Sequence, residues 1–230
     1  MKTIILLLIV WCSAPISISA QNKAFKTYRD ECSESFGITI KKPKKFKVID
    51  EKVTYKVNEK RNIGFLYRLI LEADSKDCLI LFPYFNTAKH HDSIAKNMVY
   101  GELEAAFNLG SDKDMKMKLN DGKFMIQGAS DSISYDKPDF NEYIEIIAGE
   151  KAQSYFNADT VYIYQLPLSE PYRNYNECIG VNAIKKDRPS AIIKIFFTKE
   201  CNRKEEYMKQ LFNSIHYSDI IPSRNIKNTH

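Results

Sequence analysis

The sequence holds few glycines and no glycine-rich run. Eight glycines are spread over 230 residues, which leaves little material for a loop that cradles phosphate with its backbone. The segment Gly128–Ser132 contains Ser130 but lacks the glycine that a nucleophile elbow places two residues after its serine. We therefore expect neither a nucleotide-binding loop nor a serine hydrolase.

The sequence also lacks a hydrophobic run long enough to span a membrane. The N-terminal run Ile4–Val10 follows Lys2 and is far shorter than the ~20 apolar residues that a bilayer requires. A positive residue, an apolar stretch and a small residue at Ala20 are the three parts of a cleaved signal peptide. A lipid anchor on Cys12 is disfavoured because Trp11 stands where a lipobox needs a small residue. We expect cleavage after Ala20 and a periplasmic or secreted chain without a transmembrane anchor.

No two cysteines have the Cys-x-x-Cys spacing that is typical of a zinc site. Four cysteines follow the signal peptide, at Cys32, Cys78, Cys178 and Cys201. An even number in an oxidising compartment favours two disulfides, and four cysteines allow three connectivities. Cys178–Cys201 is favoured because the segment between these cysteines has a hairpin pattern whose open end would bring them together. Cys32–Cys78 then follows by elimination, and buried free thiols are the alternative.

Catalytic and metal-binding motifs are also missing. His90-His91-Asp92 is the one histidine cluster, but adjacent residues of a helix point about 100° apart and cannot easily share one metal ion. Ser93–Lys96 matches Ser-x-x-Lys, yet the Ser-Asp-Asn and Lys-Thr-Gly motifs that accompany it in penicillin-interacting enzymes are absent. The sequence predicts no catalytic residue, metal or cofactor.

Charge is mildly positive. The formal net charge is +5, and it becomes +4 once Lys2 is removed with the signal peptide. That excess is weak support for a polyanion partner, and export argues against nucleic acid. Five of seven consecutive residues are lysines, namely Lys41, Lys42, Lys44, Lys45 and Lys47. The favoured interpretation is a solvated sheet edge that resists edge-to-edge aggregation, and the alternative is a contact for an acidic protein, glycan or lipid headgroup.

Alternating and helical patterns predict one α+β domain over residues 21–222, followed by a frayed tail at 223–230. Apolar and polar residues alternate around 36–40 and 53–57, and short apolar runs at 79–85, 160–166, 178–184 and 191–197 indicate further strands. The helical spacing of Ile94, Met98 and Leu103 predicts a helix packed on the sheet, and Tyr207–Ile215 predicts another after an Asn202–Glu205 capping box. Residues 21–34 have no clear pattern, and Tyr143–Ile147 fits a helix or a strand. We expect a mainly antiparallel, twisted sheet with helices packed on it.

Tyrosines cluster near the loop from Pro167 to Pro171. Exposed aromatic side chains there could stack on a sugar or anchor a protein partner, although most are expected to pack in the core. Tyr172 and Arg173 are the predicted binding surface, because loops carry function more often than sheets do.

Two segments resemble a known family. Phe36–Phe46 resembles the first strand and proline-containing turn of PsbP-like proteins, and Tyr207–Tyr217 is similar to that family's last helix and exit strand. This resemblance implies an antiparallel sheet sandwiched by helices. The segment Phe156–Thr160 also looks like one in uncharacterised secreted bacterial proteins. Neither resemblance implies a reaction.

These observations favour a non-enzymatic envelope protein, a binding or assembly accessory module whose partner is an envelope protein or a glycan. The alternative is a hydrolase of a cell-wall or nutrient polymer whose site is assembled from dispersed residues, because catalytic groups meet in space rather than along the chain. Facing carboxylates in a deep cleft, or a histidine beside a nucleophile, would favour the hydrolase.

Overall fold

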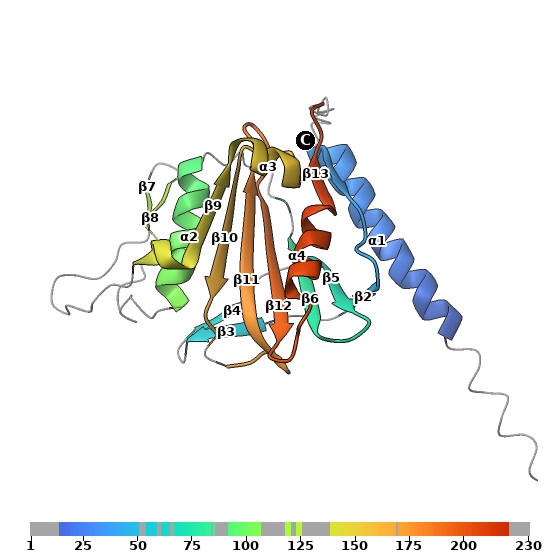
Figure 1. Ribbon diagram of the computed structural model, residues 1–230. Helices are drawn as coiled ribbons and strands as arrows, with labels where there is room; N and C mark the ends of the chain where they lie inside the picture. The colour runs from blue at the N-terminus through green and yellow to red at the C-terminus, as the bar shows by residue number, and fades with distance from the viewer. Residues whose placement is uncertain are drawn as a thin grey trace, which may run out of the picture.

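A seven-stranded antiparallel sheet with helices on both faces forms the centre of the molecule (Figure 1). The computed structural model describes residues 14–50, 54–58, 61–64, 67–83, 85, 92–106, 118–120, 123–125, 139–168 and 170–220. This arrangement confirms the predicted α+β fold, with a mainly antiparallel sheet and packed helices.

The sheet has the strand order β2-β5-β6-β12-β11-β10-β9, and every neighbouring pair is antiparallel. Its strands are β2 (Phe46–Ile49), β5 (Tyr67–Ala73), β6 (Cys78–Pro83), β9 (Ile144–Ala148), β10 (Thr160–Leu166), β11 (Tyr175–Ile184) and β12 (Ala191–Thr198). The predicted hairpin around Asp187 is β11–β12, and Tyr143–Ile147 falls mostly in strand β9, not in a helix.

Three two-stranded sheets accompany the large one. They pair β1 (Ile38–Ile40) with β13 (Ile215–Tyr217), β3 (Thr54–Asn58) with β4 (Arg61–Gly64), and β7 (Lys118–Asn120) with β8 (Lys123–Met125). The β1–β13 pair joins the two ends of the folded region, and it brings together the two segments that carry the PsbP-like resemblance.

Strand alternation divides the buried residues into two cores. Ile193, Ile195 and Phe197 of β12 lie in one core, whereas Phe196 lies in the other, as expected because successive side chains point to opposite faces. The first core also holds side chains of α1 (Ala14–Phe36), α3 (Gly149–Phe156) and α4 (Lys204–Phe212), and we call it the α4-side core. The second is closed by α2 (Asp92–Ala106) and by the 3-10 helix η2 (Phe140–Tyr143), and we call it the α2-side core.

Helix α1 begins before the predicted cleavage site and continues past it. Residues 21–34, for which no element was predicted, are therefore helical. It is anchored by Phe25, Tyr28 and Cys32, whose spacing of three and four residues puts them on one face. The Tyr28 hydroxyl also donates a hydrogen bond to the Pro83 carbonyl, with 3.0 Å between the oxygens. All three anchors follow Ala20, so removal of residues 1–20 would leave them in place.

Helix α4 begins differently from the prediction. Its N-cap residue is Arg203, which makes no side-chain cap hydrogen bond, so the predicted Asn202–Glu205 capping box does not form. Burial of Tyr207 and Leu211 holds the helix on the sheet instead. No helix of the described residues is long and apolar enough to cross a membrane.

Candidate functional site

A buried ionic cluster lies between the sheet and α2. The Lys194 ammonium, fully buried on β12, is 2.8 Å from a carboxylate oxygen of Glu102 on α2. It also donates to the Tyr164 hydroxyl at 2.6 Å, and that hydroxyl donates to the same Glu102 oxygen. Burial, and then the Glu102 charge, raise the pKa of Tyr164 well above its ordinary value, so the phenol stays neutral. Each of the three groups therefore has hydrogen-bond partners in the other two, and these bonds join α2 to the sheet.

Gly180 makes this cluster possible. Tyr164, Gly180 and Lys194 stand opposite one another on β10, β11 and β12. A Cβ atom on Gly180 would lie only 2.2 Å from the Tyr164 ring. The missing side chain therefore lets the tyrosine lie across the middle strand and reach the lysine.

A second polar cluster lies beside the first turn of α4. Arg203 donates to Asp77 at 3.2 Å and to Ser75 at 2.6 Å, and the Tyr207 hydroxyl donates to Asp77 at 2.8 Å. Burial alone would raise the Asp77 pKa, but the hydrogen bonds from Ser75, Tyr207 and Arg203 outweigh it and lower that pKa. A shallow hollow next to it is lined by residues 201–206 only. This cluster fixes the β5–β6 turn to α4.

The four cysteines are free and buried, which is the alternative to the predicted disulfides. Cys178 lies in the α2-side core and Cys201 in the α4-side core, so the sheet separates the favoured pair. Cys32 and Cys78 share the α4-side core without a bond between them. Burial raises the pKa of Cys32 to about 12 and raises that of Cys78 and Cys178 as well, so these thiols stay protonated and unreactive.

The lysine run lies between β1 and one edge strand of the large sheet. It leads into β2, an outermost strand of the large sheet, and Lys41, Lys42, Lys44 and Lys45 are exposed. Lys47, on β2 itself, is partly exposed and lies 3.0 Å from a carboxylate oxygen of the buried Glu72.

The predicted Tyr172–Arg173 surface is a tight turn. Tyr172 and Tyr175 exchange two backbone hydrogen bonds, and their rings stack with centroids 6.4 Å apart. Arg173 has a positive φ of 56° and lies over the Tyr172 ring at 5.6 Å. Tyr175 is buried and Tyr172 is half-buried, so these rings pack against the α2-side core more than they face solvent.

Most of the other residues that the sequence analysis weighed as candidates for catalysis or metal binding lie outside the described residues. They include His90, His91 and Ser130. Lys96 is exposed on α2 and lies over the Tyr100 ring at 5.4 Å. No group of three metal-ligating side chains occurs among the residues that the structure describes. His216 is half-buried on β13, and burial, with the nearby Lys41 charge, lowers its pKa.

The opposite edge of the sheet carries an acidic surface that the sequence analysis missed. Residues 139–151 contain four exposed carboxylates and one lysine, namely Asp139, Glu142, Glu145, Glu150 and Lys151. Lys151 lies 3.2 Å from Glu145, but both side chains are more than half exposed, so this ion pair is weak. Four carboxylates and one lysine leave the stretch with a net negative charge. We call the stretch 139–150 the acidic edge.

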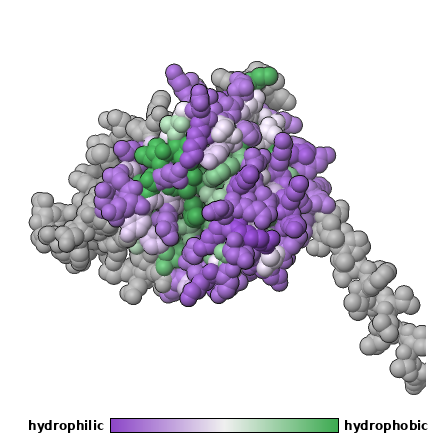
Figure 2. Space-filling view, viewed as in Figure 1, coloured by the Kyte–Doolittle hydropathy of each residue, from purple (hydrophilic) through white to green (hydrophobic). Residues whose placement is uncertain are grey.

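Apolar side chains lie next to the acidic edge. Ile146 of β9 is 53% exposed, and because it stands opposite Tyr162 of the α2-side core it faces the α2 side of the sheet. Ile163 and Ile179 occupy diagonal positions on β10 and β11 and are only half-buried at the margin of the α4-side core. Figure 2 shows an apolar patch on the α4 side of the sheet, over β9, β10 and β11, which is the side on which Ile163 and Ile179 lie.

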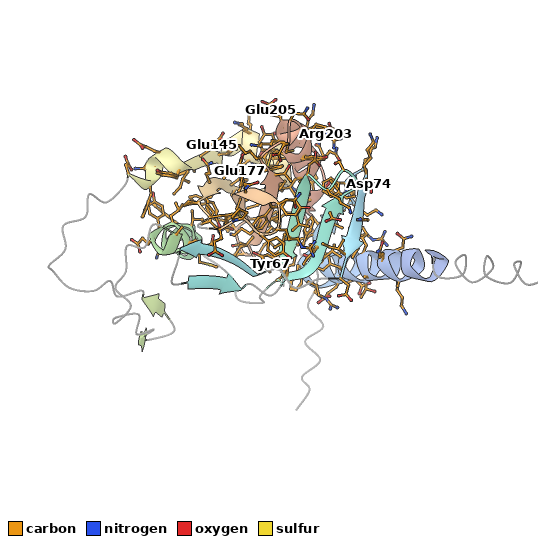
Figure 3. All side chains as sticks on the ribbon, turned by 90° about the horizontal axis from the view of Figure 1, so that it is seen from below. Tyr67, Asp74, Glu145, Glu177, Arg203 and Glu205 are labelled. Atoms are coloured by element: carbon orange, nitrogen blue, oxygen red, sulfur yellow. The ribbon has the colours of Figure 1, made fainter. Side chains whose placement is uncertain are left out.

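Carboxylates border this apolar patch on both sides. Glu145 stands opposite Ile163 in the β9–β10 register, and Glu177 lies two residues before Ile179 on β11. Figure 3 shows Glu145 and Glu177 on the same side of the sheet as α4, with Glu205. An exposed apolar centre with a charged rim is the usual form of a protein-binding surface.

Comparison with known proteins identifies no family. No protein-family model matches the chain, and no curated protein matches it.

Proposed function

We propose that the chain is an exported, non-enzymatic binding module that docks a basic, partly apolar polypeptide segment at the acidic edge. The observation that carries this proposal is the pair of half-buried isoleucines Ile163 and Ile179 on the α4 side of the sheet, bordered by Glu145 and Glu177, with the exposed Ile146 on the other side of β9. Apolar contact would supply affinity, and the carboxylates would select a basic partner and speed the encounter. Export is supported by the signal-peptide pattern that ends at Ala20.

Strand β9 offers a second means of binding. It is the outermost strand of the large sheet, so along its outer side no described strand pairs with its N–H and C=O groups. An extended segment can add to such an edge through main-chain hydrogen bonds, with alternate side chains entering neighbouring pockets. The PsbP-like resemblance, which implies an accessory fold, is compatible with such a role and stays a proposal.

The test compares variants of the chain that begins at Gln21 for binding to a native envelope fraction. The wild-type chain is expected to recover a partner, which chemical cross-linking should place at residues 139–150. The double variant Glu142→Lys, Glu145→Lys should lose that partner, because it reverses the charge of the acidic edge that borders Ile163. The matched control Glu34→Lys, Glu200→Lys reverses two exposed charges elsewhere and should retain it.

Equal recovery by both double variants, or recovery of no partner by the wild-type chain, would contradict the proposal. Turnover of a cell-wall or nutrient polymer by the purified chain would instead support the hydrolase alternative.

A further inference from the structure

The segments at the two outermost strands of the large sheet carry opposite charge, mostly on residues that adjoin the strands. The lysine run leads into β2, and the acidic edge runs through β9, at the other end of the strand order. Two β2 edges would repel each other, and so would two β9 edges. A β2 edge and a β9 edge attract each other. Charge therefore disfavours a symmetric pairing of like edges and favours a pairing of unlike edges.

Contacts within the protein already fix the backbone conformation of the lysine run. Pro43 is buried between exposed lysines. The Lys41 N–H donates to the Ser214 carbonyl at 2.7 Å, and the Lys45 carbonyl accepts from the Asp74 N–H at 2.9 Å. These contacts fix the backbone of the lysine run before any partner arrives, so binding would cost little ordering of that segment.

The acidic side is fixed as well. The Asp139 carboxylate accepts from the Asn141 N–H at 2.9 Å and so caps η2. Tyr100 of α2 donates to the Asn141 side chain at 3.2 Å and contacts the buried Phe140 ring. Strand β9 then follows directly, with its five residues paired to β10.

We propose that the partner at the acidic edge is the lysine run of a second copy of this chain, so that successive copies associate head to tail. This inference rests on the proposed function, because it names the basic segment that the acidic edge would dock. Six antiparallel steps separate β2 from β9, so the two strands run in the same direction within one molecule. If a second copy keeps the orientation of the first and is shifted in the direction in which the strands follow one another in the sheet, its β2 lies parallel to β9 of the first copy. A contact between two different surfaces leaves a free surface at each end, so it builds an open chain unless its rotation closes a ring.

Sedimentation velocity of three variants tests the inference. The first reverses the basic side, by Lys42→Glu, Lys44→Glu and Lys45→Glu. The second reverses the acidic side, by Glu142→Lys, Glu145→Lys and Glu150→Lys. The control reverses three exposed lysines away from both edges, by Lys186→Glu, Lys199→Glu and Lys209→Glu. The chain is measured at about 0.01 M and about 1 M salt, where the screening length is about 30 Å and about 3 Å.

At low salt the wild type and the control are expected to form oligomers larger than a dimer, whose mean mass rises with concentration. High salt should return them to the monomer. Each edge-reversed variant should be monomeric alone, since both of its edges then carry the same charge. An equimolar mixture of the two should associate again, because each supplies the charge that the other lost, and this regain also shows that both variants fold.

A wild type that stays monomeric at low salt, or a mixture that fails to associate, would overturn the inference. The two proposals can fail separately. If the wild type is monomeric but the acidic-edge variant still loses an envelope partner, the second copy is wrong and the binding module stands. If no variant loses a partner, the binding module is wrong.

Discussion

Gly180 shows at the scale of one residue how the sheet accommodates a buried charge. We expect Gly180→Ala to destabilise the protein by about 1–3 kcal/mol, the usual cost of overpacking, because the new methyl group would overlap the fully buried Tyr164 ring. Urea denaturation would measure the loss. In a Tyr164→Leu background the same change should cost much less, since the ring is gone. An equal cost in both backgrounds would show that the overlap is not the cause.

The ion pair of Lys194 and Glu102 gives a second prediction at this scale. Lys194→Met should lower the free energy of unfolding by about 3–5 kcal/mol, because it leaves the Glu102 carboxylate without its cation at a largely buried position. Adding Glu102→Leu should recover most of that loss, since an apolar pair of similar volume needs no compensating charge. Thermal or urea unfolding of the two variants measures the difference. A double variant as unstable as Lys194→Met alone would contradict this account.

His216 gives the protein a predictable dependence on pH. Burial and then Lys41 lower its pKa in the folded state, so the unfolded chain takes up the proton at higher pH. Stability is therefore unaffected by this group well above the ordinary histidine pKa of about 6.5, and it falls as the pH drops below that value towards the folded pKa. The variant His216→Gln should flatten this part of the stability profile, measured as urea midpoints at stepped pH. An unchanged slope would assign the pH dependence to other groups.

At the scale of secondary structure, α1 shows where the sequence pattern was insufficient. Among its described side chains, the packed face holds three buried residues, Phe25, Tyr28 and Cys32, and the half-buried Phe36, among lysines and acidic residues. That pattern is too sparse to indicate a helix, because tertiary contacts supply most of its stability. The hairpin β11–β12 was predictable because both strands are mainly apolar and a single turn separates them. The capping box at Asn202 failed because the helix begins one residue later than the motif requires.

The packed face of α1 makes a direct prediction. We expect Phe25→Ala to destabilise the chain by about 3 kcal/mol through loss of buried apolar surface, whereas Lys26→Ala on the exposed side should change stability little. A chain that begins at Gln21 should melt at the same temperature as the chain that begins at Met1, since the anchoring side chains follow Ala20. Melting temperatures from circular dichroism test both statements. A large loss for Lys26→Ala would mean that the helix packs on a different face.

The candidate sites also differ in how far the sequence could predict them. The lysine run is contiguous, so its place at a sheet edge could be predicted from the sequence. The acidic edge is dispersed over residues 139–150, a stretch whose pattern fits a helix or a strand, so its charges could not be assigned to one surface. The cluster of Lys194, Tyr164 and Glu102 joins residues up to 92 positions apart, and only the strand register and α2 bring them together.

For the whole molecule, compartment and thiol state can be measured together. Intact-mass analysis of the exported protein should give the mass of residues 21–230, because the signal-peptide pattern ends at Ala20. Alkylation without reductant should leave the folded chain unmodified, since all four thiols are buried, and should add four groups once the chain is denatured. Two disulfides would instead give no addition under either condition. That outcome would require a pairing other than Cys178–Cys201, because these cysteines lie on opposite faces of the sheet. Cys32, Cys78 and Cys201 all lie in the α4-side core, so a disulfide between two of them would leave Cys178 without a partner, and two disulfides would contradict this fold.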